Sequence, residues 1–279
     1  MKIVPLNLKL MLAARLSSLR RRIAGARTRA LLVESEHGLL LVEPGDMQVG
    51  RKLISMGAYS RTELERLIGL VTPESEVLVV GGHIGTLAIP LAKASRALTV
   101  VEANPNTYRL LEWNLLINGC TNARALNMAA SDKREQIRFL VSSANSGGSK
   151  RLPVERDYRY LYDSPKTISL PAAPLDEIFP ETTFDLIVMD IEGSEYFALT
   201  GMPRLLSRAQ ILAIEFLPHH LARVAGISAG EFVNQIHPFF DELTIPSKNL
   251  TIAKAQFHAV LNDMFNRNET DEGLIFRKR

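Results

Sequence analysis

The chain has 279 residues, which fits one large α/β domain with modest additions and excludes a multidomain assembly. Apolar residues make up 46% and charged residues 23%, which excludes intrinsic disorder and predicts a globular, soluble protein. No apolar run approaches the roughly 18 residues that would span a bilayer. The single cysteine, Cys120, excludes a disulfide framework and a Cys-based zinc site, as expected for a cytoplasmic protein.

The net charge of +3 is distributed unevenly. Residues 1–30 contain eight of the 33 basic residues and none of the 30 acidic ones, so the rest of the chain is net acidic. An acidic body disfavours nucleic acid as a partner. In residues 1–29, apolar side chains recur at spacings of three and four, which predicts a basic amphipathic helix formed around Leu8, Leu12, Leu16, Leu19 and Ile23. Such a helix packs on its own domain with a solvated basic face, or it contacts an anionic membrane surface or a partner protein; a transit peptide has the same composition.

Residues 30–73 are predicted to form a small N-terminal β/α unit. Two short apolar runs, 30–33 and 39–42, flank a polar turn that ends at Gly38, which is typical of paired strands. Ser60 and Glu63 have the spacing of a capping box, so we expect a helix from Ser60 to Leu70.

Residues 74–279 are predicted to form the main domain. Short apolar runs are each followed by a helical stretch, which is typical of parallel βαβ units and predicts a Rossmann-like α/β fold. The predicted strands are 77–80, 97–102, 123–128, 184–189 and 210–216, with an extended piece at 136–141 and last strands at 243–245 and 274–277. The predicted helices are 86–94, 106–118 and 253–266.

Residues 142–174 interrupt this alternation and are rich in Ser, Gly, Pro and Tyr. A structureless insertion of this length is usually a functional loop or a disordered one. Its basic and aromatic residues can cover a substrate or stack on a sugar or base, or they can form a solvated lid without specific contacts. These residues are Lys150, Arg151, Arg156, Tyr158, Arg159, Tyr160 and Tyr162.

Two features at the ends of the first two main strands predict a cofactor with a nucleoside part. The segment 81–86 is a glycine turn, which allows close approach of a ligand to the backbone and aims helix N-terminal amides at it. Glu102 follows Gly81 by 21 residues, at the position where a carboxylate accepts hydrogen bonds from ribose hydroxyls. In an open parallel sheet, both features lie at the ligand-binding edge.

The choice of cofactor rests on charge and spacing. The turn reads G-G-x-x-G rather than the G-x-G-x-x-G of dinucleotide sites. The fourth strand ends in a segment with three carboxylates, Asp190, Glu192 and Glu195, which suits a cationic sulfonium and not a pyrophosphate. S-adenosylmethionine is therefore favoured over NAD.

An ordered set of motifs resembles the FkbM family of class I methyltransferases from about residue 50 to 220. The most specific part is Asp185–Glu195, which reads D-L-I-V-M-D-I-E-G-S-E. The other parts are Gly57–Tyr59, Val77–Gly85, Val101–Pro105, Asn114, Asn118, Ala129–Asp132 and Asn145–Gly148. The resemblance implies a mostly parallel seven-stranded sheet with helices on both faces, S-adenosylmethionine as cofactor and S-adenosylhomocysteine as product.

The resemblance also implies roles for individual residues. Gly81, Gly82 and Gly85 would surround the methionine part of the cofactor, with His83 shaping the site. Glu102 and the adjoining Ala103 would lie at the ribose, and Met128, Ala129 and Ala130 near the adenine. Asp190 would face the methionine amino group or the substrate.

Transfer of a methyl group to a hydroxyl requires a base near the methyl group. The candidate catalytic residues are Asp190, Glu215 and His219, with His220 beside the last; all lie near the ends of predicted strands at the ligand-binding edge. Asp190 and Glu215 are also suitable ligands for Mg²⁺, but binding of the cofactor and capping of a turn account for them, and no metal is predicted.

The sequence thus predicts an S-adenosylmethionine-dependent O-methyltransferase acting on a hydroxyl of a sugar or a natural-product-type small molecule. An alternative is a non-catalytic or regulatory member of the fold that binds the cofactor weakly and acts through a partner. This alternative is motivated by Val79, which stands where the family usually has an acid, and His83, where it has Asn. A nucleotide-dependent oxidoreductase is a third reading. We expect a cytoplasmic protein whose residues 1–29 can bring it to a membrane surface.

Overall fold

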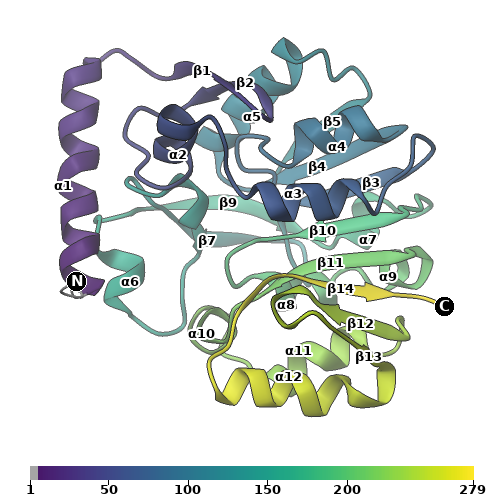
Figure 1. The fold of residues 1–279 in the computed structure, drawn as a ribbon. Coiled ribbons are helices and arrows are strands. Elements are labelled where there is room, and N and C mark those ends of the chain that lie inside the picture. Colours follow the sequence, from purple (N-terminus) through teal and green to yellow (C-terminus); the bar gives the residue numbers. More distant parts are fainter. Residues whose placement is uncertain (1–5) are drawn as a thin grey trace.

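The computed structural model describes residues 6–279, and their side chains from residue 8. Its centre is an eight-stranded sheet of the order β13-β12-β14-β11-β10-β3-β4-β5 (Figure 1). The strands from β11 to β5 are parallel, and β14, β12 and β13 are antiparallel to their neighbours. Their bounds are β3 (Glu76–Val80), β4 (Ala97–Glu102), β5 (Ala123–Asn127), β10 (Leu186–Met189), β11 (Ile211–Phe216), β12 (Glu242–Ile245), β13 (Leu250–Ala253) and β14 (Asp271–Arg277).

The central strands are continuous apolar runs because both faces of the sheet are covered by helices. In β3, Val77 and Val79 face one apolar core, and Leu78 and Val80 face the other. One face is covered by α2 (Val49–Met56), α3 (Arg61–Ile68), α4 (Ala88–Ala94) and α5 (Pro105–Ile117). The other is covered by α7 (Leu175–Ile178), α8 (Glu195–Thr200), α9 (Pro203–Arg208), α11 (Ala229–Ile236) and α12 (Phe257–Asn266). The predicted Rossmann-like fold is confirmed.

The sheet has one strand more than the seven expected. Residues 250–253 form β13, which pairs antiparallel with β12 and was not predicted. The turn between them is the 3₁₀ segment Pro246–Lys248 followed by Asn249 in the left-handed region, with φ 47°. Asn adopts this conformation more readily than most residues, so the hairpin closes without a glycine.

The N-terminal part begins with α1 (Leu6–Ala24), which stands at the edge of the molecule (Figure 1). It is followed by the hairpin of β1 (Leu31–Ser35) and β2 (Gly38–Val42). The predicted helix after Ser60 is observed as α3, but the predicted capping box is wrong. Ser60 has φ 48° and makes no capping hydrogen bond, because a side-chain cap needs an extended backbone at that position.

Asn114 of α5 and Asn118, the residue that caps the end of this helix, hold the hairpin against the main domain. Asn114 is fully buried, accepts a hydrogen bond from the Leu41 amide at 2.6 Å and donates to the Ile84 carbonyl oxygen at 2.8 Å. Asn118 donates to the Leu39 carbonyl oxygen at 2.7 Å. Asn114 therefore links β2 to the glycine turn.

Residues 142–174 are not the structureless insertion expected from composition. They contribute two strands to a second, four-stranded sheet of the order β6-β9-β7-β8. In β9, Leu170 and Ala172 are buried and alternate with exposed residues, one of which is Pro171. Because proline is uncommon within strands, Pro171 argues against a strand when the sequence alone is considered. The elements are β6 (Ala129–Ala130), β7 (Glu135–Val141), β8 (Lys150–Arg151), β9 (Lys166–Ala173), the 3₁₀ turn Ser146–Gly148 and α6 (Tyr158–Leu161).

The remaining segments are short. After β11, the chain forms α10 (Pro218–His220) and a single π-helical stretch, Leu221–Ala225. A 3₁₀ turn, Lys254–Gln256, leads into α12. Among the described residues, no helix combines the length and the apolar character needed to cross a bilayer.

Candidate functional site

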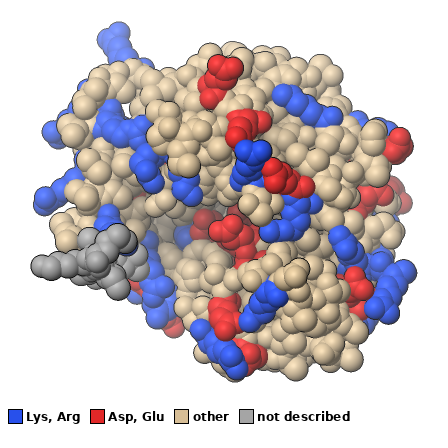
Figure 2. All heavy atoms as spheres, in the orientation of Figure 1, with Lys and Arg blue, Asp and Glu red and all other residues tan. Residues whose placement is uncertain are grey.

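A cavity of about 240 Å³ lies where the strand order reverses, between the carboxyl ends of β3 and β10. The segments after β3, β4, β5 and β10 and the carboxyl end of β11 form much of its wall, and the loop at 145–149 closes one side. Figure 2 shows a hollow near the middle of this face with acidic side chains beside it. The cavity thus occupies the ligand-binding edge of the sheet.

The glycine turn after β3 is required by contacts inside the protein. Gly81 has φ 96°, and a Cβ atom there would lie 1.8 Å from the backbone oxygen of Asp190. A Cβ atom on Gly82 would lie 2.2 Å from Cγ2 of Val100. Both glycines line the cavity, but Gly85 does not, and a Cβ there would meet Ile89 and Leu111. The turn therefore lets β3 pack closely against its neighbours while its backbone borders the cavity.

Glu102, at the end of β4, holds a buried carboxylate in the cavity wall. Its oxygens accept hydrogen bonds from the amides of His83, at 2.7 Å, and Asn104, at 2.8 Å, and from the Thr107 hydroxyl at 2.9 Å. Burial raises the pKa of Glu102 to about 7 in spite of these donors. The carboxylate is thus fixed in orientation before any ligand binds.

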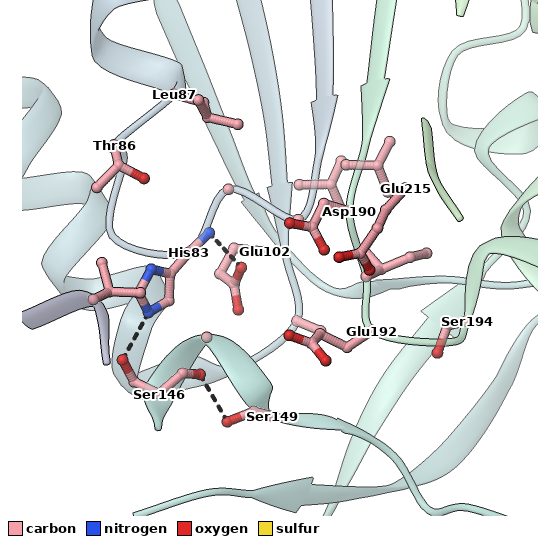
Figure 3. Close-up of a pocket in the computed structure, with 18 of the residues that line it drawn as sticks. His83, Thr86, Leu87, Glu102, Ser146, Ser149, Asp190, Glu192, Ser194 and Glu215 are labelled. Carbon is pink, nitrogen blue, oxygen red and sulfur yellow. Dashed lines mark hydrogen bonds between the residues drawn. The ribbon is translucent and has the colours of Figure 1, made fainter. Parts of the chain in front are cut away.

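His83 attaches the glycine turn to the loop that follows β7. Its Nε2 atom lies 2.7 Å from the Ser146 hydroxyl (Figure 3), which in turn contacts the carboxylate of Asp46. Burial lowers the pKa of His83, so the imidazole is neutral at pH 7. Sequence reasoning missed Asp46, although Ser146 belongs to the Asn145–Gly148 motif that it singled out.

A cluster of carboxylates forms the opposite wall. One oxygen each of Asp190, Glu195 and Glu215 lie within 4.8 Å of one another, and Figure 3 shows Asp190 and Glu215 pointing toward each other. Burial, followed by the neighbouring acids, raises the pKa values of Asp190 and Glu215 well above their ordinary range. None of the described residues lining this cavity is Lys or Arg, whereas six are acidic: Glu63, Glu102, Asp190, Glu192, Glu215 and Glu272.

A second cavity, of about 250 Å³, adjoins the first and has a different character. Lys150 and Arg159 line it together with aromatic and imidazole side chains, those of Tyr160, Tyr162, His219 and His220. Lys150 is buried, and its ammonium group lies 4.7 Å from the centre of the Tyr160 ring. This cavity suits a ligand with hydroxyl or anionic groups on a flat or apolar frame.

Glu192 lines both cavities. It follows β10 and has φ 56°, a conformation that non-glycine residues rarely adopt and that is often found at functional sites. Its Oε2 atom accepts a hydrogen bond from Lys150 Nζ at 2.9 Å. Lys150 Nζ also lies 3.1 Å from Nε2 of His220. Burial and then Lys150 lower the pKa of His220 strongly, so its neutral ring accepts this hydrogen bond.

Most of the residues predicted from the sequence meet at the first cavity. Gly81, Gly82, His83, Glu102, Ala103, Met128, Ala129, Ala130, Asp190 and Glu215 all line it. Gly85 lies apart from it, and His219 lines the second cavity instead. Val79, the departure from the family pattern, is buried in the apolar core and does not border the cavity. Sequence reasoning missed the position of Glu192 between the cavities and its pairing with Lys150, because only the folded chain brings residues 42 apart into contact.

Comparison with known proteins identifies the family. The family model described as "Methyltransferase FkbM domain" matches residues 80–245, more than half of the chain. No curated protein matches. Two solved structures with a similar fold are the methyltransferase FkbM from Methylobacillus flagellatus KT and a TehB-like SAM-dependent methyltransferase from Corynebacterium glutamicum.

The M. flagellatus protein is 16% identical to this chain, and the two superpose with a TM-score of 0.45. The aligned region covers 74% of this chain and 44% of the M. flagellatus protein. The C. glutamicum protein is 15% identical to this chain, with a TM-score of 0.44. The aligned region covers 82% of this chain and 94% of the C. glutamicum protein. The chain thus spans less than half the length of the first protein. Similarity at this level does not extend to substrate or activity. On the evidence of the family match, the chain belongs to the FkbM methyltransferase family, a family of the class I fold whose cofactor is S-adenosylmethionine.

Proposed function

We propose that this protein transfers the methyl group of S-adenosylmethionine to a hydroxyl of a sugar or natural-product-type small molecule bound in the second cavity. The observation that supports this most directly is the pair of adjoining cavities with different walls. One is lined by six acids and no described Lys or Arg, and the other by cations, aromatic rings and imidazoles. A cationic cofactor fits the first, and a hydroxylated acceptor fits the second.

The residues of the first cavity match the parts of the cofactor. The Glu102 carboxylate can accept hydrogen bonds from ribose hydroxyls, and Met128, Ala129 and Ala130 offer apolar surface to the adenine. Asp190 and the glycine turn border the space for the methionine part. The bound cofactor supplies an electrophilic methyl group on a positively charged sulfur. The acidic wall stabilises that charge and, by the same field, disfavours a pyrophosphate, which argues against the oxidoreductase alternative.

The acceptor proton needs a base that reaches the boundary between the cavities. Glu192 is the carboxylate that borders both, and Lys150 fixes one of its oxygens. We assign it the task of accepting the hydrogen bond of the acceptor hydroxyl and, on methyl transfer, the hydroxyl proton. His219 is the second candidate, because burial lowers the pKa of its imidazole and keeps it neutral at pH 7. Burial and the neighbouring acids raise the pKa values of Asp190 and Glu215, and a bound sulfonium would favour their ionised forms, so we assign these two groups to the cofactor side.

The first test is calorimetric titration with S-adenosylhomocysteine, with NADH as the competing ligand class. We expect saturable binding of the nucleoside thioether and none of NADH. Glu102→Ala should weaken binding by about tenfold to a hundredfold, whereas Glu112→Ala, on the exposed side of α5, should not change it.

Labelled S-adenosylmethionine with a panel of hydroxylated acceptors then tests turnover. Transfer that Glu192→Gln reduces would support the proposed reaction. Binding of the cofactor without transfer to any acceptor would instead favour the non-catalytic or regulatory alternative. Failure to bind S-adenosylhomocysteine would contradict the proposal.

A further inference from the structure

Helix α1 presents its apolar stripe to solvent and not to the domain. Leu8, Leu12, Leu16, Leu19 and Ile23 have exposed fractions between 39% and 77%. Their spacing places them on one side of the helix, so they form a continuous strip. An apolar strip of this length on the surface of a globular protein usually marks an interaction site. We call these five residues the leucine strip.

The opposite side of α1 attaches the helix to the domain through small and polar residues. The Ser17 hydroxyl and the Arg21 guanidinium donate hydrogen bonds to the carbonyl oxygen of Ser143, and Arg21 pairs with Glu43 at 2.7 Å. Arg20 donates to the carbonyl oxygen of Asp46 at 3.2 Å. Because these contacts fix the rotation of the helix, the leucine strip faces outward in the folded protein.

The charged residues of α1 and of the segment that follows it all have one sign. Lys9, Arg15 and Arg22 are exposed on α1, and Arg27 and Arg29 are exposed in the segment that follows it. No acid precedes Glu34 in the sequence. Figure 2 shows several blue basic side chains along the edge of the molecule where α1 lies in Figure 1, and others elsewhere on this face. An exposed apolar strip flanked by Lys and Arg is the pattern of a helix that lies in the plane of an anionic membrane surface.

We infer that α1 docks the protein on a membrane surface rich in anionic lipid headgroups, with the leucine strip inserted at the boundary of the acyl chains. The flanking cations face the headgroups, and the polar inner side of the helix remains attached to the domain. Leu10, on that inner side, lines the second cavity, so docking brings this cavity close to the lipid surface. A second copy of the chain is a poorer occupant, because two α1 helices in contact would bring Arg15 and Arg22 of each close to like charges.

The test is cosedimentation of the full chain with vesicles of phosphatidylcholine, with and without phosphatidylglycerol, and it needs neither cofactor nor acceptor. We expect binding to the anionic vesicles that weakens as salt is added. Leu12→Gln with Leu19→Gln should reduce the partition coefficient by about tenfold or more. Arg15→Gln with Arg22→Gln should reduce it by about thirtyfold, since each cation near such a surface contributes about fivefold.

The matched control replaces two exposed apolar residues elsewhere. Trp113→Gln with Leu116→Gln, on α5, removes comparable exposed surface and should leave binding unchanged. Circular dichroism and the melting temperature of each variant check that it folds. The proposal is overturned if the wild-type chain ignores anionic vesicles, or if the control pair reduces binding as much as the α1 pair. Self-association lost in the α1 pair, without vesicle binding, would also overturn it and assign the leucine strip to a second copy.

Discussion

Lys150 Nζ lies 2.9 Å from Oε2 of Glu192, and both side chains border the second cavity. The pair is sheltered from solvent, since the side chain of Lys150 is 6% exposed and that of Glu192 is 23% exposed. The Glu192 carboxylate also borders the first cavity, so the pair lies at the boundary between the two cavities. Lys150 sets the orientation of Glu192, the one carboxylate among the described residues that lines both cavities.

Replacing Lys150 should therefore affect transfer more than cofactor binding. Lys150→Met removes the hydrogen bond that orients Glu192, and we expect methyl transfer to fall by roughly a hundredfold. Affinity for S-adenosylhomocysteine should change by less than about threefold, because Lys150 does not line the first cavity. Calorimetry and a labelled-methyl assay measure the two effects. Lys166→Met, at an exposed site of β9, serves as the control. Equal loss of binding and transfer would refute the assigned position of the pair.

The buried acids predict a specific dependence of stability on pH. Burial raises the pKa values of Glu63, Glu102 and Glu195 from 4.5 to about 7. The folded protein then binds more protons than the unfolded chain between these values. The contribution of these groups to stability is fully present below about pH 4.5, is lost as the pH rises to about 7, and changes little beyond.

Denaturant unfolding of the ligand-free protein across this pH range measures the slope. Glu102→Gln should make the slope shallower because one of the contributing groups is gone. Binding of the sulfonium cofactor should favour the ionised carboxylates and so release protons near neutral pH, which calorimetry in buffers of different ionisation enthalpy detects. Proton uptake on binding would contradict this assignment.

Asn114→Ala should destabilise the fold by about 2–4 kcal/mol, because it leaves the buried amide of Leu41 and the carbonyl oxygen of Ile84 without their partner. Asn118→Ala removes a hydrogen bond at a more exposed site and should cost about 1 kcal/mol. Denaturant unfolding compares the two variants. If both changed stability equally, Asn114 would not be the link between β2 and the glycine turn.

Restoring the acid that the family pattern has at residue 79 should harm this protein. Val79 is buried in an apolar core, where an unpaired carboxylate is strongly unfavourable, so Val79→Asp should cost about 3 kcal/mol or more. Because Val79 does not border the cavity, cofactor affinity should not improve. Val79→Ile should cost far less, since it stays apolar and adds one methylene. Tighter binding of S-adenosylhomocysteine by Val79→Asp would show that the departure weakens the cofactor site.

The parts of the fold that the sequence predicted are those with a strong local signal. Runs such as Val77–Val80 and Leu186–Met189 are apolar throughout because both faces of these strands are buried. Such runs predict buried strands from the sequence alone. Glu102 and Asp190 were found because the carboxyl ends of parallel strands meet at one edge. By contrast, β9 alternates and contains Pro171, and its pairing with β7 is visible only in the folded chain.

The parts of the site that were missed depend on long-range packing. Lys150 and Glu192 are 42 residues apart, and His83 and Ser146 are 63 residues apart. Neither pair has a spacing that any local pattern encodes. The outward rotation of the leucine strip was likewise not decided by its periodicity, because it depends on the contacts of Ser17, Arg20 and Arg21 with loops far along the chain.

Because Glu192 lines both cavities, we expect the occupants of the two cavities to influence each other's binding. A ligand that draws this carboxylate toward one side, or neutralises it, changes the field on the other side. Such coupling is reciprocal: if a ligand in the second cavity changes the affinity for the cofactor by some factor, the cofactor changes the affinity for that ligand by the same factor. The affinity measured for either ligand alone then differs from its affinity when the other cavity is occupied. Each ligand should therefore be titrated in the presence of the other.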